Sequence, residues 1–247
     1  MSVSEHTDTI PQNDMEEKSA KTIQKNYRGQ LIRRKMLPNI LCIIQSYLSC
    51  IDIKSCTLSD DGRTNSCFDE DNIIDILIKK FPDRIKKPDI RMWYDILVKD
   101  YKYGWLPVNI KTTTTQTSDN TGNLAMCVYS YTDEVLDLDK KYQNGSMSKI
   151  LIKKLSEKKI NYKSKKDYYF LVVNKNNTNE VILNSCKGLS QLTPNSNNLP
   201  FQVNWSKNKD YNFINIHKSI NKLITCLQKP PPSWSETFLQ DIRNITI

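Results

Sequence analysis

Hydrophobic residues recur with helical spacing in the first part of the chain, after a polar start. Residues 1–17 lack hydrophobic periodicity, which predicts a disordered tail over 1–18. Ser19 can cap a helix that continues to residue 36, and Pro38 permits a second helix over 38–48. One face of the first helix carries Ile23, Tyr27, Leu31 and Ile32. We therefore expect a helical extension over 19–58.

The remaining chain mixes apolar strand patterns with further helical patterns. Two apolar stretches, 91–98 and 105–113, flank a polar loop at 99–104 and predict a β-hairpin. A polar loop is expected at 59–65, and further strands are expected over 167–175, 180–186 and 200–205. Helices are expected over 68–81, 123–138, 146–159, 211–229 and 234–245. The pattern predicts an α/β (α+β) domain over 59–247, with a mixed β-sheet flanked by helices.

The composition adds a positive charge to this picture. The 247 residues include 36 basic and 27 acidic side chains, and the formal net charge of +9 favours an anionic partner such as nucleic acid. A lysine-rich soluble surface explains the same charge. The seven cysteines form no CxxC pair, which argues against a zinc site and for free thiols in a reducing compartment. With no signal peptide and no apolar run of transmembrane length, we expect a soluble, intracellular protein without a membrane partner.

Polar residues gather at one end of the predicted hairpin. A loop centred near 101–104 makes the numbers of paired residues sum to about 205, which sets Asp95 opposite Ile110. Asp95 then lies between Asn109 and Lys111, on a strand whose other face is apolar. Phosphodiester hydrolysis uses such a cluster, because carboxylates hold Mg²⁺ and a lysine orients or deprotonates the attacking water. A cross-strand ion pair between Asp95 and Lys111 on a solvated sheet face is the simpler alternative.

These residues resemble the PD-(D/E)xK pattern of type II restriction endonucleases. The similar segments are "RMWYDILV…PVNIKTTTTQTSDN" and, upstream, "GRTNSCFDE", and the resemblance covers roughly residues 60–210. It implies a restriction-endonuclease-like fold and Mg²⁺-dependent hydrolysis of double-stranded DNA. Glu70 and Asp95 would bind the metal, Lys111 would position or activate water, and Asn109 would be a neutral ligand where the pattern has an acid. The Ile110 carbonyl is a further ligand that the resemblance offers.

Two of these assignments have alternatives. Asp89 follows Pro88 and also spells the "PD" of the pattern, but at about 3.3 Å per residue its strand position lies far from Lys111, so Asp95 is preferred. Glu70 could simply be an acid near a helix N-terminus that the helix dipole favours.

The resemblance also indicates where DNA would be contacted. A loop that leaves the active strand is a common DNA contact in restriction enzymes, which implicates Thr113, Thr115, Asp119 and Asn120, and Lys207 lies beside a late strand. A turn followed by a helix N-cap at 119–120 is the alternative. Trp205 is expected either in the core or at a basic rim. Restriction enzymes are often dimers, so a homodimer is a further implied partner.

The first helix carries a second resemblance. The segment "IQKNYRGQLIRR" is similar to the IQ motif at each fixed position, which are Ile23, Gln24, Arg28, Gly29 and Arg33. This implies binding of calmodulin or another EF-hand protein, whose acidic, methionine-rich groove suits a basic amphipathic helix. A basic helix that packs on the domain or touches DNA is the alternative. An IQ motif beside a restriction-enzyme-like domain, with many Asn, Lys and Ile residues, resembles proteins of large DNA viruses, which implies host cytoplasm or virion. Rival functions are an inactive DNA-binding module and an interaction protein.

Overall fold

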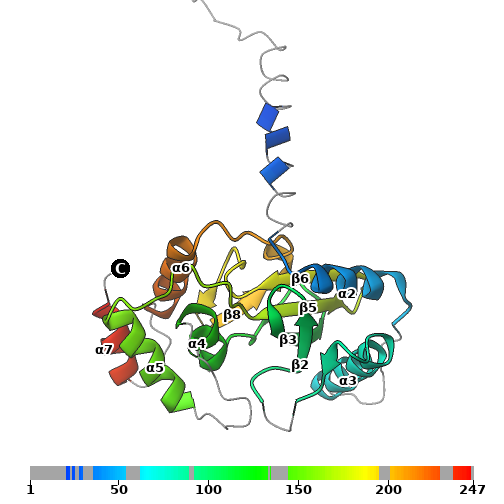
Figure 1. The fold of residues 1–247 in the computed structure, drawn as a ribbon, viewed down its shortest axis with the longest axis horizontal. Helices are drawn as coiled ribbons and strands as arrows, with labels where there is room; N and C mark the ends of the chain where they lie inside the picture. Colours follow the sequence, from blue (N-terminus) through cyan, green and yellow to red (C-terminus); the bar gives the residue numbers. More distant parts are fainter. Residues whose placement is uncertain are drawn as a thin grey trace, which may run out of the picture.

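This computed structural model describes residues 21–22, 24–25, 28–29, 36–53, 62–88, 92–132, 134, 144–194, 201–228 and 236–245. A five-stranded sheet lies at its centre (Figure 1). The strand order is β1 (Ile85–Lys86), β2 (Ile96–Asp100), β3 (Gly104–Thr113), β5 (Tyr169–Asn174) and β6 (Asn177–Ser185). Strands β3 and β5 are parallel and the other neighbours are antiparallel, so the predicted mixed sheet is confirmed.

Helices cover both faces of this sheet, as predicted. One face packs against α2 (Asn39–Cys50) and α3 (Gly62–Lys80), and the other lies towards the helices α4, α5, α6 and α7 (Figure 1). Their bounds are Leu124–Thr132, Asn144–Ser156, Ile216–Gln228 and Glu236–Arg243. Because both faces are covered, β5 is buried at every position, with Phe170 and Val172 on one side and Leu171 and Val173 on the other.

A second, small sheet lies beside the first. It joins β4 (Ser118–Asp119), β8 (Phe201–Asn204) and β7 (Thr193–Pro194), and the short 3₁₀ helix η1 (Trp205–Lys207) follows β8. Trp205 is fully buried at this point, so of its two expected environments the structure shows the core. The strand expected over 200–205 is present, but its two-residue neighbours were not predicted.

Part of the predicted N-terminal extension packs against the sheet. Helix α2 was assigned to an extension over 19–58, separate from a domain over 59–247, yet its apolar face is part of the core. Ile40, Leu41, Ile44 and Leu48 are buried against β-sheet residues, and the Gln45 amide donates a hydrogen bond of 2.7 Å to the Val181 carbonyl of β6. The sheet therefore depends on α2 to cover one of its faces.

This packing gives a direct stability test. Replacing Ile44, which is fully buried, by alanine is expected to lower the free energy of unfolding by about 2–5 kcal/mol, because the cavity cannot fully close. The adjacent Ile43 is 46% exposed, and its replacement by alanine should change the free energy by no more than about 0.5 kcal/mol. Urea denaturation followed by circular dichroism measures both. Equal small effects would mean that α2 is dispensable.

The pairing register of the hairpin differs by one residue from the prediction. Lys99 pairs with Trp105 and Ile96 with Val108, so paired numbers sum to 204 and not to about 205. The cause lies in the turn at 101–103, where the Asp100 carboxylate accepts hydrogen bonds from the N–H groups of Lys102 and Tyr103. Gly104 follows with a φ of 74°, a conformation that glycine adopts without strain. Asp95 consequently lies just before β2 and not opposite Ile110.

Several other boundaries also differ from the sequence predictions. Helix α3 begins at Gly62, inside the loop expected at 59–65, and β2 begins at Ile96 although a strand was expected from residue 91. Of the IQ positions, Gln24, Arg28 and Gly29 are helical, and Ile23 and Arg33 lie outside the described residues, as do the tail at 1–18 and Asp89. In the described part, the six cysteines are free, and none of the helices is long and apolar enough to cross a membrane.

Candidate active site

Strand β3 extends beyond its neighbour β2 and leaves an open edge there. The ladder with β2 ends at Val108, whose carbonyl accepts a hydrogen bond of 3.0 Å from the Asp95 N–H. On its other side β3 stays paired with β5 as far as Thr113. The N–H groups of Ile110 and Thr112 point towards the open side, so they need acceptors from elsewhere in the protein.

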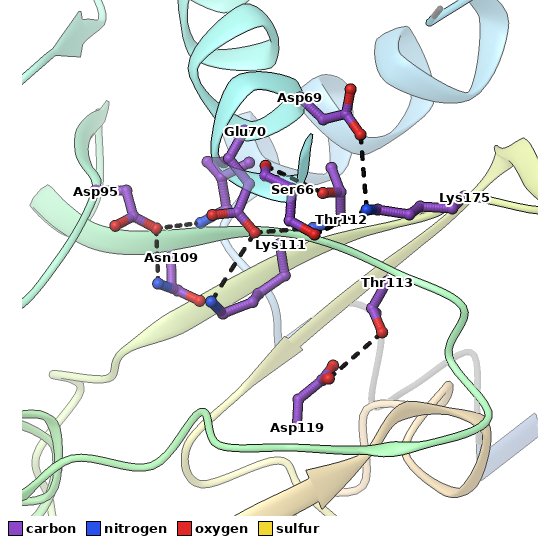
Figure 2. A network of polar contacts seen from close by, with 11 residues as sticks. Ser66, Asp69, Glu70, Asp95, Asn109, Lys111, Thr112, Thr113, Asp119 and Lys175 are labelled. Atoms are coloured by element: carbon purple, nitrogen blue, oxygen red, sulfur yellow. Dashed lines mark hydrogen bonds and ion pairs between the residues drawn. The ribbon is translucent and has the colours of Figure 1, made fainter. Parts of the chain in front are cut away.

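Two carboxylates supply these acceptors (Figure 2). Asp95 Oδ2 accepts hydrogen bonds from the Ile110 N–H at 2.7 Å and from the Asn109 side-chain amide at 2.6 Å. Glu70 Oε1 accepts a hydrogen bond of 3.1 Å from the Thr112 N–H. The structure therefore brings both predicted acids to one edge of β3, two residues apart along the strand.

The position of Glu70 follows from the amphipathic pattern of α3. Ser66, Glu70, Ile73 and Leu77 fall at helical spacing on one face. Ile73 and Leu77 are buried against the sheet, which anchors the C-terminal part of that face. The polar part, one to two turns earlier, then lies over the edge of β3, and the Ser66 carbonyl accepts a hydrogen bond of 3.3 Å from the Thr112 hydroxyl.

Two lysines flank Glu70. Lys111 Nζ lies 3.9 Å from Glu70 Oε1, so the predicted lysine is at the cluster. Lys175, in the turn between β5 and β6, was not predicted; it donates a hydrogen bond of 2.7 Å to Ser66 Oγ and lies 3.8 Å from Asp69 Oδ2. The segment "VVNKNN" gave no signal for Lys175, because its approach to α3 depends on the parallel pairing of β3 and β5.

Burial governs the protonation of the carboxylates. It raises the pKa of Asp95 above its ordinary value, against the opposing effects of the Ile110 N–H and of Lys111. Burial likewise raises the pKa of Glu70, and Lys111 and the Thr112 N–H partly offset this. Each acid thus holds its proton more tightly in the folded protein than in the unfolded chain, and each is poised to gain stability from a bound cation.

These raised pKa values predict a pH dependence of stability. An acid whose pKa is raised on folding stabilises the protein below its unfolded pKa, and this stability is lost as the pH rises through the folded pKa. The unfolded values are 3.8 for Asp95 and 4.5 for Glu70. As the pH rises above about 4, wild type should therefore lose stability relative to the isosteric variant Glu70→Gln/Asp95→Asn. Chemical denaturation at each pH measures this. Parallel curves would contradict the prediction, and exposed Asp52→Asn is the control.

The available oxygen atoms fit a hard divalent cation. Besides the two carboxylates, the Asn109 side-chain oxygen is buried and has no hydrogen-bond partner within the described structure. The Ile110 carbonyl points to the same open edge as its N–H, since both groups of one strand residue face the same side. Carboxylate, amide and carbonyl oxygens are ligands that Mg²⁺ prefers. Across the described ranges, however, no cluster of three or more His, Cys, Asp or Glu residues is arranged to hold a metal.

The residues expected to contact DNA are divided between interior and surface. Thr113 and Thr115 are buried, and the Thr113 hydroxyl donates a hydrogen bond of 3.4 Å to Asp119 Oδ1. Burial also raises the pKa of Asp119, which lies in β4 opposite Val203. Asn120 and Lys207 are exposed. The alternative of a helix cap at 119–120 is wrong, because the residue that accepts from the α4 N-terminus is Asn123, at 2.7 Å from the Met126 N–H.

The molecule is thus a mixed α/β protein with two partly buried carboxylates and a lysine at an open strand edge. Comparison of the chain with models of protein families, with curated proteins and with solved structures gives no match.

Proposed function

We propose that the protein is an Mg²⁺-dependent endonuclease of restriction-enzyme-like fold that hydrolyses phosphodiester bonds of double-stranded DNA. The observation that carries the proposal is the convergence of Asp95 and Glu70 at the open edge of β3, with Lys111 Nζ 3.9 Å from the Glu70 carboxylate. Their order along the chain also supports it. A helical glutamate, an aspartate at the start of a strand and a lysine on the next strand follow the restriction-enzyme pattern that the sequence resembles.

The side chains of the cluster divide the proposed work. Asp95 and Glu70 would hold the cation, and the buried oxygen of Asn109 and the Ile110 carbonyl would offer further oxygen ligands. When bound, Mg²⁺ supplies charge stabilisation at the phosphate and lowers the pKa of a nearby water. Lys111 would orient this water or take its proton, and the Glu70 carboxylate, 3.9 Å away, would hold the lysine side chain at the site.

A basic strip on the hairpin supports DNA as the substrate. Trp105 lies on the same face of β3 as Asn109 and Lys111, because all three positions are odd-numbered along the strand. The ammonium groups of Lys86 and Lys99 lie 4.6 Å and 5.8 Å from the centre of the Trp105 ring. Both lysines are exposed, so they can contact phosphates of a duplex that reaches the carboxylates.

The proposal is tested by incubating the purified chain with supercoiled double-stranded DNA in the presence of Mg²⁺ or of EDTA. Cleavage with Mg²⁺ and none with EDTA is the expected result. Ca²⁺ in place of Mg²⁺ is expected to support DNA binding with little cleavage. Intact DNA after prolonged incubation with Mg²⁺ and Mn²⁺ would refute the nuclease activity.

A second candidate, a DNA-binding module without catalysis, is favoured by one contact. The Asn109 amide donates to the same Asp95 oxygen that accepts from the Ile110 N–H, so this oxygen already has two donors without a metal. In this candidate the contact between Asn109 and Asp95 only stabilises the edge of β3 and has no catalytic role. For this candidate we expect DNA binding that weakens steeply with salt, and intact DNA with every divalent metal.

A further inference from the structure

A positively charged cavity lies at the opposite end of β3 from Lys111. Its volume is about 300 Å³. The walls come from the hairpin turn before β3, the segment before β5 and the residues after β6. Since β3 and β5 are parallel and β6 runs antiparallel to β5, these three places meet at one end of the sheet. None of the residues that line the cavity belongs to the carboxylate cluster at Asp95 and Glu70.

Four lysines line this cavity, namely Lys102, Lys165, Lys166 and Lys187. The lining holds one acid, Asp167, which leaves a surplus of three positive charges. The Asp167 carboxylate is itself engaged, because it accepts hydrogen bonds from the Tyr168 N–H at 2.8 Å, the Lys187 N–H at 3.2 Å and the Ser185 hydroxyl. A cavity wall of one charge sign concentrates an oppositely charged ligand.

Buried Lys187 fixes the positions of two of the other lysines. Its ammonium group donates hydrogen bonds to the carbonyls of Ser164, at 3.4 Å, and of Lys166. These bonds tie the segment before β5 to the end of β6, and the Lys166 N–H in turn bonds Ser164 Oγ at 3.1 Å. The rim that carries Lys165 and Lys166 is therefore anchored to the sheet, so the charges are positioned before any ligand arrives.

Aromatic rings form the other part of the lining. Tyr103, Tyr169, Tyr211 and Phe213 contribute them. The Tyr211 ring lies directly against the backbone of Gly188, where an added Cβ would be 2.3 Å from the ring. Only glycine permits this approach. The rings of Tyr211 and Phe213, which are two positions apart in the sequence, form a tilted pair with centroids 6.5 Å apart. Flat, partly exposed rings beside lysines suit an aromatic base that is attached to a phosphate.

We propose that this cavity binds a nucleotide, with the phosphate among the lysines and the base against the Tyr211 and Phe213 rings. The ligand is a free nucleotide or the 5′-phosphorylated end of a DNA strand, which share this chemistry. The proposal does not rest on the nuclease activity, since the cavity shares no residue with the carboxylate cluster.

Isothermal titration calorimetry of the full chain in EDTA tests the proposal. The probes are AMP, inorganic phosphate, and tetrathymidylate with a 5′-phosphate or a 5′-hydroxyl. AMP or the 5′-phosphorylated strand should bind at least ten times more tightly than inorganic phosphate and the 5′-hydroxyl strand. Tight binding of AMP would show that a free nucleotide is a sufficient ligand. If the 5′-phosphorylated strand binds and AMP does not, the ligand is a strand end.

Matched charge variants locate the site. Lys102→Glu/Lys165→Glu changes two exposed lysines of the cavity and should weaken binding at least tenfold. Lys79→Glu/Lys153→Glu changes the net charge equally at exposed positions on α3 and α5 and should bind like wild type. Phe213→Leu should weaken the nucleotide and leave inorganic phosphate unaffected. Equal binding of nucleotide and inorganic phosphate by wild type, or equal losses in the two double variants, would overturn the proposal.

Discussion

Replacing Lys111 by alanine is expected to lower the rate of Mg²⁺-dependent DNA cleavage by roughly 10²- to 10⁴-fold, the usual contribution of a positioned acid–base group. Lys111 Nζ lies 3.9 Å from Glu70, and Lys111 electrostatically opposes the raised pKa of both Glu70 and Asp95. Its removal would take away the proposed proton acceptor and would leave two partly buried acids without this compensation.

Initial rates of plasmid nicking measure the effect, with binding to the same DNA measured separately in EDTA. Lys79→Ala, at an exposed position near the end of α3, is the matched control and should cleave like wild type. Lys111→Arg retains the charge but is a poor proton acceptor, so it separates electrostatic stabilisation from proton transfer. Cleavage by Lys111→Ala at the wild-type rate would remove this residue from the proposed mechanism.

Replacing Asn109 by aspartate is expected to raise the cleavage rate by about tenfold or more, because a third anionic oxygen strengthens the binding of Mg²⁺. The same substitution should lower the free energy of unfolding in EDTA by about 1–3 kcal/mol. It removes the amide that donates to Asp95 at 2.6 Å and places a second negative charge beside this partly buried acid. The variant is therefore expected to depend on metal for its stability more than wild type does.

Thermal denaturation with EDTA and with Mg²⁺ measures the second part of this prediction. Mg²⁺ should raise the melting temperature of Asn109→Asp more than that of wild type, because a ligand that binds the folded state more tightly stabilises it more. Asn120→Asp makes the same chemical change at an exposed position of the chain and should show no such difference. If Asn109→Asp gains neither cleavage nor stabilisation by Mg²⁺, the binding module becomes the better account of the site.

The sequence identified those elements whose pattern is long and regular. Strand β3 was expected over 105–113 and spans Gly104–Thr113, because its alternation of apolar and polar residues reflects one buried and one partly polar face. Helix α6 was likewise expected, since its apolar spacing continues over several turns. Strands β1, β4 and β7 were missed because two residues are too few to show a period.

The site itself was predictable only where local pattern sufficed. Lys111 and Asn109 share a face of β3 by simple alternation, so sequence reasoning placed them correctly relative to each other. The pairing of Asp95 was one residue wrong, because the hairpin turn depends on the Asp100 carboxylate and on the positive φ of Gly104. Lys175 was missed altogether, since no spacing in the sequence relates it to Ser66, 109 residues away.

The open edge of β3 has a consequence for self-association. Unpaired N–H groups on a strand edge are a template for a strand from another molecule. Asp95 and Glu70 occupy the Ile110 and Thr112 N–H groups, and their charge repels the carbonyls of an incoming backbone. The two carboxylates thereby also oppose growth of an intermolecular β-sheet at this edge. A chain that lost both carboxylates would therefore lose the proposed metal ligands and, at the same time, its protection from aggregation at this edge.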